Sequence, residues 1–477
     1  MNVEDLLKRE EGKTLEFKRD LSSPKNLLRT LVAFANTAGG QVIIGVDDKT
    51  RLPVGVERPL HEEERVCSLI ADAIRPRLVP NVEMITVEDK TLLVVEVFLS
   101  GSRPHWLKAE GPEGGVYVRL GSTNRQADRE LIAELRRSVE GVAFDELPIP
   151  GLSVDDLDLA ALKTLFHDQR DLGENELLRL RLLKNEQGRL VPTKGAVLLL
   201  GKERQKHFPD AWVQCGRFVG RDKADIFDHI ELYDHLPQAV DSIMLFLKKH
   251  AMRGADFSEI RRKDVWSIPL GILREAVINS LVHADYSQRG APIRIAFFDD
   301  RIEIENPGIL LPGMTIDDMR QGVSKIRNHV IARVFRELNL IEQWGSGIPR
   351  IFREAEELGL PELQIMEIGM RLRFTVTLAE RITVQEATEQ VTEQVTEQVR
   401  RILNCLKNEP LGARDVMQSL GLRHRPTFLY DYLQPAMDAG LVEMTQPESP
   451  KSPTQKYRLT AKGKAALIER SQSESGV

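Results

Sequence analysis

Helical and β-rich segments alternate along most of this 477-residue chain, and this alternation limits the possible folds more than any other feature. The run PKNLLRTLVAFANT (residues 24–37) has the composition of a helix and stops at Gly39 and Gly40. The β-rich run QVIIGVDD follows at residues 41–48. Glycine ends helices and β-branched residues favour strands, so the pair predicts a helix-to-strand unit. Because the chain is too long for one compact core, we expect a multidomain α/β (α+β) protein.

The first predicted domain covers residues 1–145. Its other expected elements are two helices and two strands, at residues 61–74, 128–139, 91–99 and 115–121. Pro148, Pro150 and Gly151 follow them. Such a density of residues that interrupt regular structure predicts a domain boundary.

The second predicted domain covers residues 151–380, with a core at about 265–360. Its expected elements in chain order are two helices and three strands, at about 228–252, 270–286, 292–300, 301–308 and 371–379. Helices alternating with strands again indicate an α/β arrangement, here an α/β sandwich.

Residues 381–399 repeat the tetrapeptide TEQV three times. Four residues are close to the helical period of 3.6, so Val391, Val395 and Val399 would form a slowly drifting apolar stripe. We interpret the segment as a helical linker, with a short oligomerising helix as the alternative. Residues 400–470 then predict three helices and a hairpin at about 441–459.

Composition limits the class of protein in a different way. No apolar run reaches the roughly 20 residues of a membrane span, and the N-terminus lacks a secretory pattern, so we expect a cytoplasmic location and no membrane partner. Three separated cysteines exclude a disulfide framework. The net charge of −6 neither indicates nor excludes nucleic-acid binding, which depends on local basic patches.

A polar stripe runs along the predicted helix at residues 270–286. Glu275, Asn279 and His283 are spaced at i, i+4 and i+8, which puts them within about 80° of arc on an otherwise apolar helix. Buried polar groups need partners, so the stripe either meets water or lines a site. Spacing alone leaves both interpretations open.

The segments after this helix favour a site. Strand-like runs ending in ENPG are followed by a loop and by the run IEQWGSGIPRI. This order resembles the GHKL ATPase family, in the divergent branch found next to Schlafen-AlbA-type domains and often labelled RecG-like. The resemblance is close over about 265–360 and implies ATP and Mg²⁺ as cofactors. It implies that Glu275 is the base that activates water for ATP hydrolysis and that Asn279 is the Mg²⁺ ligand, roles that suit a carboxylate and an amide oxygen.

The same resemblance implies the rest of the nucleotide site. It assigns binding roles to His283 at the edge and to Asn306, Gly308, Lys325, Gly345, Ser346 and Gly347. The second glycine segment is expected to open a helix, where free N–H groups favour phosphate. The family has Asp where this chain has Asn306, and an amide oxygen can still accept from an adenine amino group.

Three N-terminal segments, TLEFKRD, LVAFANTAGGQVIIGVDD and YVRLGSTNRQA, resemble the Schlafen-AlbA-type domain over most of residues 5–140. The resemblance implies nucleic-acid binding. Some Schlafen relatives cut RNA with acidic residues, and the matching positions are Glu11, Glu16 and Asp48, which would hold a divalent metal. Two alternatives remain: Asp47 is an equally placed third ligand, or Glu16 and Lys18 form a structural ion pair.

Basic residues of this domain are candidates for phosphate contacts, which would give affinity without sequence choice. They are Lys18, Arg19, Arg119 and Arg125. The sequence Gly12-Lys13-Thr14 resembles the end of a Walker A loop, but the first glycine of that motif is missing, so we interpret it as chance.

The C-terminal segment resembles a winged helix. Arg423 and Arg425 precede its candidate recognition helix, where arginine can reach guanine edges or phosphates. Winged helices also bind proteins, and the residues leave that alternative open.

Together these features predict an ATP-binding, nucleic-acid-binding regulator, with DNA favoured over RNA and a homo-oligomer expected from the GHKL resemblance. The alternatives are an ATP-controlled nuclease with a role in defence and a non-catalytic scaffold. No Walker A loop is present, so a helicase motor is not expected.

Overall fold

The computed structural model describes most of the chain. The described residues are 3–166, 172–251, 253–256, 263–341, 347–379, 399, 401–407, 410–422, 428–438, 441–445 and 455–460. The chain divides into two compact units, residues 1–381 and 382–477. The TEQV repeat lies outside the described residues except for Val399.

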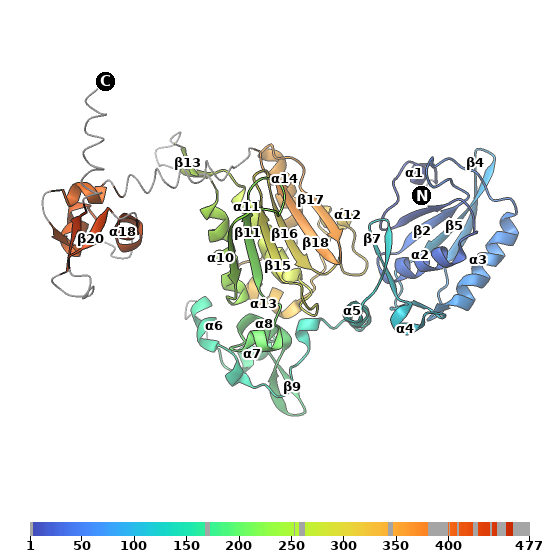
Figure 1. Cartoon of the computed structure of the whole chain (residues 1–477). Helices are drawn as coiled ribbons and strands as arrows, with labels where there is room; N and C mark the ends of the chain where they lie inside the picture. The colour runs from blue at the N-terminus through green and yellow to red at the C-terminus, as the bar shows by residue number, and fades with distance from the viewer. Residues whose placement is uncertain are drawn as a thin grey trace, which may run out of the picture. The chain divides into compact units, whose positions relative to one another are not determined.

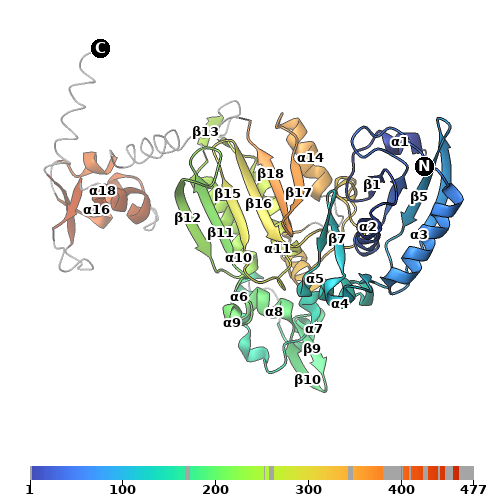
Figure 2. The ribbon, with the colours of Figure 1, turned by 45° about the vertical axis from the view of Figure 1, so that its right-hand side comes forward.

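The N-terminal part of the first unit is built on a four-stranded sheet. Its strands, in spatial order, are β1 (Leu15–Lys18), β2 (Gly40–Ile44), β5 (Lys90–Val97) and β4 (Asn81–Val87). β1 and β2 are parallel, and the other neighbours are antiparallel. Both faces are covered, as Figures 1 and 2 allow the reader to follow. The helices involved are α1 (Val3–Leu7), α2 (Pro24–Asn36) and α3 (Pro59–Ala73).

Alternation along the strands explains why both faces are covered. In β2, Val42 and Ile44 point into the core shared with α2 and α3, whereas Ile43 points into the core shared with α1. Successive strand side chains face opposite sides, so a continuous apolar run buries both. Gly39 makes the turn from α2 into β2, with φ +76° and the Val97 carbonyl oxygen only 2.9 Å from where a Cβ would lie.

A hairpin and a helix complete this part. The hairpin pairs β7 (Tyr117–Leu120) with β8 (Thr123–Gln126), and α5 (Arg129–Glu140) follows. Asp128 caps α5 by accepting from the Leu131 amide, and Gly141 ends it in the left-handed conformation. The core beneath α5 includes Ile309, a residue far along the chain.

Short elements link this part to a second, larger sheet. They are η1 (Phe144–Glu146), η2 (Val154–Asp156), α6 (Leu159–Leu165), α7 (Glu174–Arg179), the antiparallel pair β9 (Leu183–Glu186) and β10 (Arg189–Pro192), α8 (Lys194–Leu200) and α9 (Arg204–His207). The short helix α4 (Gly111–Gly114) lies within the N-terminal part, before β7. β3 (Ile74–Arg75) and β6 (Trp106–Leu107) form a further small pair.

The second sheet has six strands in the order β12-β11-β15-β16-β18-β17. Their bounds are Ile226–Leu232, Val213–Phe218, Ile293–Phe297, Arg301–Pro307, Arg371–Thr377 and Gln364–Ile368. Only β11 and β15 are parallel among the paired neighbours.

Helices cover one face of this sheet. The central one, α11 (Leu270–His283), contacts β16, α10 (Leu236–Lys249) and α14 (Gly347–Glu357). The remaining described elements are α12 (Ile316–Arg320), α13 (His329–Glu337) and the strand pair β13 (Arg253–Asp256) and β14 (Lys263–Trp266).

The expected helix at about 228–252 is wrong in its first part. Residues up to Leu232 form β12, an edge strand paired antiparallel with β11, and α10 begins only at Leu236 with Pro237 in its first turn. The last four residues of β12, HIEL (229–232), alternate polar and apolar, which is the period of a half-exposed strand. Proline at the first turn is a helix start signal that marks the true boundary.

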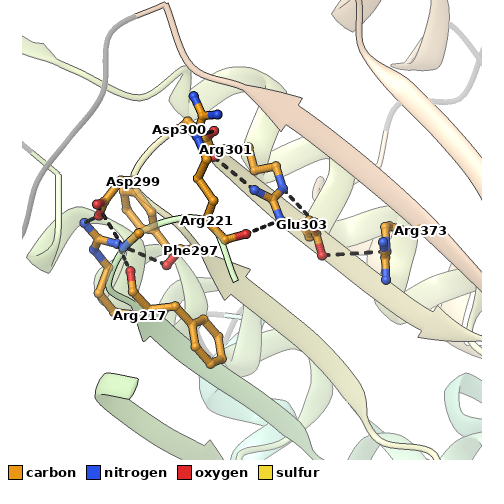
Figure 3. Close-up of polar contacts among 10 residues, drawn as sticks. Arg217, Arg221, Phe297, Asp299, Asp300, Arg301, Glu303 and Arg373 are labelled. Carbon is orange, nitrogen blue, oxygen red and sulfur yellow. Dashed lines mark hydrogen bonds and ion pairs between the residues drawn. The ribbon is translucent and has the colours of Figure 1, made fainter. Parts of the chain in front are cut away.

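The opposite face of the six-stranded sheet is charged, as Figure 3 shows. Along β16, Ile302 and Ile304 are buried, and the intervening Glu303, which is also buried, pairs with arginines. The ion pairs of this face are Arg217–Asp299, Arg221–Asp300, Arg301–Glu303 and Arg373–Glu303. Alternation on β16 therefore separates an apolar face that meets α11 from a face held by ion pairs.

The second unit has the element order of a winged helix. Helical residues 401–405 are followed by β19 (Leu411–Gly412), α16 (Ala413–Ser419), η3 (Phe428–Leu433), α18 (Gln434–Asp438), β20 (Val442–Met444) and β21 (Lys456–Leu459). The three strands pair in the order β19-β21-β20 around one apolar core. The antiparallel pair of β20 and β21 is the hairpin expected at about 441–459.

Candidate nucleotide-binding site

The polar stripe of α11 lies on a cavity. Glu275, Asn279 and His283 all line it, and each is half-buried, whereas most other residues of the helix are fully buried. Arg274 lies on the exposed side of α11, whereas the stripe of Glu275, Asn279 and His283 is on the side that borders the cavity. Of the two interpretations of the stripe, the lined cavity is the one that the structure supports.

The cavity has a volume of about 320 Å³, within the usual range for small-molecule sites. Its apolar wall comes from the strands and the segment after β16, and includes Ile304, Leu372, Phe374, Ile365 and Met314. Its polar rim comes from α11, from residues 323–327 and from the first turn of α14. An apolar wall with a few polar groups is the usual composition of a nucleotide pocket.

Glu275 and Asn279 are bonded to each other. The Asn279 Nδ2 group donates to Glu275 Oε1 over 2.9 Å and to the Glu275 carbonyl oxygen over 2.8 Å. The other carboxylate oxygen of Glu275 accepts from Arg350 Nη2 over 3.1 Å. Both bonds of Asn279 are donated by its Nδ2 group. Its Oδ1 carries no hydrogen bond to the described residues. The free oxygen is the atom that a hard cation or a water would contact.

Gly347 allows the first turn of α14 to approach Glu275. A Cβ at this position would lie 2.0 Å from Glu275 Oε1, so no other residue fits without displacing the carboxylate. Gly345 and Ser346 fall outside the described residues. α14 has eleven residues, and its N-terminal N–H groups lie next to the carboxylate at the edge of the cavity. An anion there would meet free donors and the positive end of the helix.

Asn306 and Gly308 close the opposite side. Asn306 is buried on β16, and its Nδ2 donates to the Pro307 carbonyl oxygen over 3.1 Å. Gly308 has φ +101°, and a Cβ there would lie 2.9 Å from the Asp285 Cβ and 3.2 Å from Arg327 Cζ. The glycine is therefore required by both backbone conformation and the close approach of two side chains.

His283 shares its end of the cavity with a permanent cation. Burial, with a further contribution from the positive charge of Arg327, lowers the pKa of His283 to about 4. The imidazole is therefore neutral at physiological pH, with a donor and an acceptor nitrogen. In this form it can hydrogen-bond a ligand without adding charge.

The wall formed by residues 309–314 is fastened to the N-terminal part of the same unit. Glu367 Oε1 accepts from the Leu310 amide over 2.8 Å and from Lys13 Nζ over 2.7 Å. The Gly313 amide donates to the Thr37 carbonyl oxygen over 2.6 Å. Lys13, which the sequence led us to dismiss with its neighbours as a chance motif, thus has a structural role.

Residues 325–327 form another wall. Lys325, one of the residues implied by the family resemblance, is exposed and donates to the Pro312 carbonyl oxygen over 2.7 Å. Arg327 is buried and bonds both the Ile309 carbonyl oxygen and the Glu134 carboxylate of α5. The cavity lined by Glu275, Asn279 and His283, which we call the nucleotide cavity, is therefore bounded by segments that also contact the N-terminal part.

The N-terminal carboxylates are not gathered in the same way. Glu16 pairs with Lys18 and with Arg119. Glu11 Oε1 accepts from the Phe17 amide over 2.8 Å, and Asp48 is exposed in the turn after β2. No group of three His, Cys, Asp or Glu residues able to hold a metal occurs within the described residues. Glu16 therefore forms the ion pair with Lys18 that was the alternative interpretation.

Asp47, the competing ligand, organises the same turn. Its Oδ1 accepts from the Thr50 amide over 2.9 Å and from the Lys49 amide over 3.1 Å. These backbone hydrogen bonds, with a smaller contribution from Arg19, lower the pKa of Asp47. Its nearest described contacts are therefore those of a turn residue.

The expectation that Arg119 contacts nucleic acid needs correction. Its side chain is 1% exposed and is held by Glu16, by Asn124 and by the Gly12 carbonyl oxygen, so it is not accessible. Arg19 and Arg125 are exposed, and Lys18 is half-buried. Arg423 and Arg425 lie outside the described residues.

Sequence reasoning missed Arg350 and the apolar wall. Arg350 lies on α14, four residues after Ser346, and pairs with Glu275. Its position shortly after the glycine segment was the sequence signal that could have assigned it to the site. Phe374 and Leu372 come from a strand that was expected but not assigned to the site. Their inward direction follows from pairing with β16, which the sequence does not specify.

The fold and the cavity define a class: a multidomain α/β protein in which a sheet domain precedes a helix-backed six-stranded sheet with a nucleotide-sized cavity. Residues 11–128 match the family model described as "Schlafen, AlbA_2". Residues 290–378 match the model described as "Putative ATP-dependent DNA helicase recG C-terminal". The chain therefore joins a segment similar to the Schlafen AlbA_2 domain to a segment similar to a RecG-like C-terminal domain of the HATPase type. Residues 397–460 match "Filamentation induced by cAMP protein Fic-like, C-terminal domain".

Solved structures offer three further similarities. The DIP2311 protein of Corynebacterium diphtheriae is 18% identical, over 98% of both chains, with a TM-score of 0.43. The N-terminal domain of a RecG-related protein from Nitrosomonas europaea is 31% identical, over 26% of this chain and 90% of its own, with a TM-score of 0.22. A Fic family protein from Desulfovibrio desulfuricans G20 is 18% identical, over 71% and 77%, with a TM-score of 0.14.

All three TM-scores are below 0.5, so these similarities carry no weight for the assignment. A search of curated proteins gave no match. Among the described helices, none combines the length and the apolar character needed to cross a bilayer.

Proposed function

We propose that this chain is an ATP-binding and nucleic-acid-binding regulator in which nucleotide at the α11 cavity modulates the engagement of DNA. The two family descriptions relate the chain to ATP and to nucleic acids. The observation that carries the proposal is the cavity itself, where an apolar wall faces the polar stripe of α11.

Each part of an ATP molecule has a matching surface in this proposal. The base would pack on the apolar wall near Phe374, with the Asn306 amide able to accept from the adenine amino group after reorientation. The phosphates would lie toward the N-terminus of α14. Asn279 Oδ1 would hold Mg²⁺ together with phosphate oxygens and water. The ion would screen the phosphate charge when bound.

Hydrolysis is a weaker part of the proposal than binding. Glu275 is the candidate base, but both of its oxygens have protein partners, Asn279 and Arg350. Arg350 is nearly half-exposed, so it can exchange the carboxylate for a phosphate oxygen and leave Glu275 free to accept a proton from water. Turnover therefore requires a rearrangement that binding alone does not.

The first experiment measures binding. The full chain is titrated with a fluorescent ATP analogue and Mg²⁺, in comparison with Asn279→Ala. Loss of a charge-assisted contact is expected to weaken affinity by about 10- to 100-fold. Asn81→Ala, an exposed asparagine on β4, is the matched control and should bind as the wild type does. Absence of binding by the wild type would favour the scaffold alternative.

The second experiment addresses regulation. A ligand shifts an equilibrium only through its different affinities for the two states. DNA affinity of the full chain should therefore differ between nucleotide-free protein and protein saturated with ATP and Mg²⁺. Superimposable binding curves would contradict the coupling while leaving nucleotide binding intact. RNA of the same sequence tests the preference for DNA, and sedimentation of the same samples tests the expected homo-oligomer.

The nuclease alternative has less support. The paired Glu16 and the exposed Asp48 would need to separate from their present surroundings to share a metal. Incubation of RNA and DNA with Mg²⁺ or Mn²⁺, followed by comparison with Glu16→Gln and Asp48→Asn, tests it. Cleavage that both variants remove would establish the alternative, and intact substrates would argue against it.

A further inference from the structure

A second cavity, of about 390 Å³, lies between α5 and the segment that bounds the nucleotide cavity. We call it the seam cavity. Residues 137–144 contribute one side, and Leu311, Pro312 and residues 325–329 contribute the other. Lys325, Ile326 and Arg327 line both this cavity and the nucleotide cavity, so the two spaces share one wall.

Cationic side chains predominate in the seam cavity. Arg103, Arg137, Lys325 and Arg327 line it, against two carboxylates, Glu134 and Asp285. The Glu134 carboxylate is already paired with Arg327. Four cations against two carboxylates leave an excess of positive charge in a partly enclosed space. Charges interact more strongly there than in water.

Neither Arg103 nor Arg137 forms an ion pair among the described contacts, although the charge of Arg137 also acts on the Glu134 carboxylate. Arg103 donates to the Ser100 carbonyl oxygen and, over 3.2 Å, to Ser138 Oγ. Arg137 lies with its guanidinium carbon 5.4 Å from the centre of the Phe144 ring. Burial lowers the pKa of Arg103, which reflects the cost of keeping its charge away from water. An anion between these two groups would remove that cost.

Unpaired polar atoms are also buried at this cavity. Arg327 is 7% exposed, and its Nε has no hydrogen-bond partner within the described structure. The same holds for Arg103 Nε. Asn328 is fully buried, and its Oδ1 is an acceptor without a described partner, because its Nδ2 donates to the carbonyl oxygens of Val282 and Ala284. Buried polar atoms without partners are uncommon, and here three of them belong to residues that line one cavity.

We propose that the seam cavity binds a small phosphate monoester, such as a sugar phosphate. Guanidinium groups bind phosphate oxygens through paired donors, and the arginines supply several such donors in one place. The volume matches a small molecule rather than a nucleic-acid strand. The acceptor of Asn328 suits a ligand that carries a hydroxyl donor beside its phosphate. This site is separate from the nucleotide cavity, and the proposal does not depend on ATP binding there.

The test uses the full chain and three probes: inorganic phosphate, ribose 5-phosphate and ribose, each followed by isothermal titration calorimetry. Both phosphate probes should bind, ribose 5-phosphate more tightly, and ribose should not bind. Arg137→Gln and Arg103→Gln should each weaken binding by about tenfold or more, as expected for loss of a hydrogen bond to a charged group. Arg136→Gln, an exposed neighbour on α5, should match the wild type.

Two controls separate this site from others. Asn279→Ala alters the nucleotide cavity and should leave binding of ribose 5-phosphate unchanged, and thermal unfolding monitors the fold of each variant. The proposal is overturned if neither phosphate probe binds, if Arg136→Gln has the same effect as Arg137→Gln, or if Asn279→Ala abolishes binding. It is also overturned if a short oligonucleotide, but not ribose 5-phosphate, binds in an Arg137-dependent manner.

Discussion

Two glutamates in this chain, Glu16 and Glu275, each face an arginine, and their surroundings differ sharply. The Glu16 side chain is 9% exposed, and its Arg119 partner is 1% exposed. Glu275 is 17% exposed at a cavity, and its Arg350 partner is 45% exposed. The sequence made both glutamates candidates for catalysis, and it did not show that one would be buried and the other would border a cavity.

The contrast shows what distinguishes a structural carboxylate from one available to a ligand. Both oxygens of Glu16 are bound by buried or half-buried cations, and breaking such a pair leaves an uncompensated charge. Glu275 is held by one neutral amide and by one arginine that water can solvate. A ligand can replace the second kind of partner at low cost.

The largest expected effect is on the buried pair. Arg119→Met removes the main partner of Glu16 and leaves a buried carboxylate with Lys18 alone, so the free energy of unfolding should fall by about 3–5 kcal/mol. Urea denaturation of the full chain measures it. Arg125→Gln, on the exposed strand of the same hairpin, should change stability by no more than about 0.5 kcal/mol. Equal effects of the two substitutions would remove the basis of the contrast.

The next effect concerns pH and the nucleotide cavity. Between about pH 6.5 and 4 the unfolded chain protonates His283 while the folded chain keeps it neutral, because its pKa is about 4 when folded and 6.5 when unperturbed. The unfolded state then binds more protons, so stability is greatest above pH 6.5 and falls toward pH 4, by an amount on the order of 2–3 kcal/mol.

Comparison with His283→Gln isolates this effect. Burial raises the pKa of Asp145 to about 6, which acts in the opposite direction in the same pH range, but it does so in both proteins. The stability difference between wild type and His283→Gln should therefore change with pH below 6.5 and stay constant above it. A constant difference from pH 7.5 to 4.5 would show that the cavity tolerates a charged imidazole.

A smaller effect is expected at the contact between α14 and Glu275. Gly347→Ala places a methyl group in steric clash with Glu275 Oε1, so the carboxylate must move and its bond to Asn279 is disrupted. Nucleotide affinity should fall by about 10-fold or more, since overpacking costs about 1–3 kcal/mol. Titration with the ATP analogue measures it. Unchanged affinity would indicate that the Glu275–Asn279 bond is not needed for binding.

The smallest effect belongs to Arg350. Because its side chain is nearly half-exposed, Arg350→Gln should change the free energy of unfolding by about 1 kcal/mol or less. Urea denaturation beside Arg119→Met makes the comparison direct. A loss as large as that of Arg119→Met would mean that Glu275 is a structural residue like Glu16.

Local patterns were sufficient to predict much of the fold. The helices α2, α3, α5 and α11 and the strands β2, β5, β15, β16 and β18 lie where apolar runs and glycine breaks indicated. The polar stripe of α11 was visible from spacing, because a helix of fixed period converts sequence distance into direction. β12 was missed because an exposed edge strand carries weak β signals and here precedes a long helix.

The environment of each candidate residue could not be predicted in the same way. Lys13 and Glu367 are separated by 354 positions, and their ion pair depends on how two sheets pack. The burial of Arg119 likewise results from tertiary contacts with Gly12 and Glu16. Sequence reasoning therefore proposed which groups could carry chemistry, and it failed to tell accessible groups from enclosed ones.

Ile309 has a consequence for the way the chain behaves under limited proteolysis. It follows β16 and lines the nucleotide cavity, yet its side chain belongs to the hydrophobic core beneath α5. A cut in the backbone between residues 141 and 151 would leave that core intact, so the two fragments should remain associated in native buffer. Nucleotide-dependent changes in this wall would then alter the protection of the N-terminal fragment against further proteolysis, even though the two fragments are no longer joined by a peptide bond.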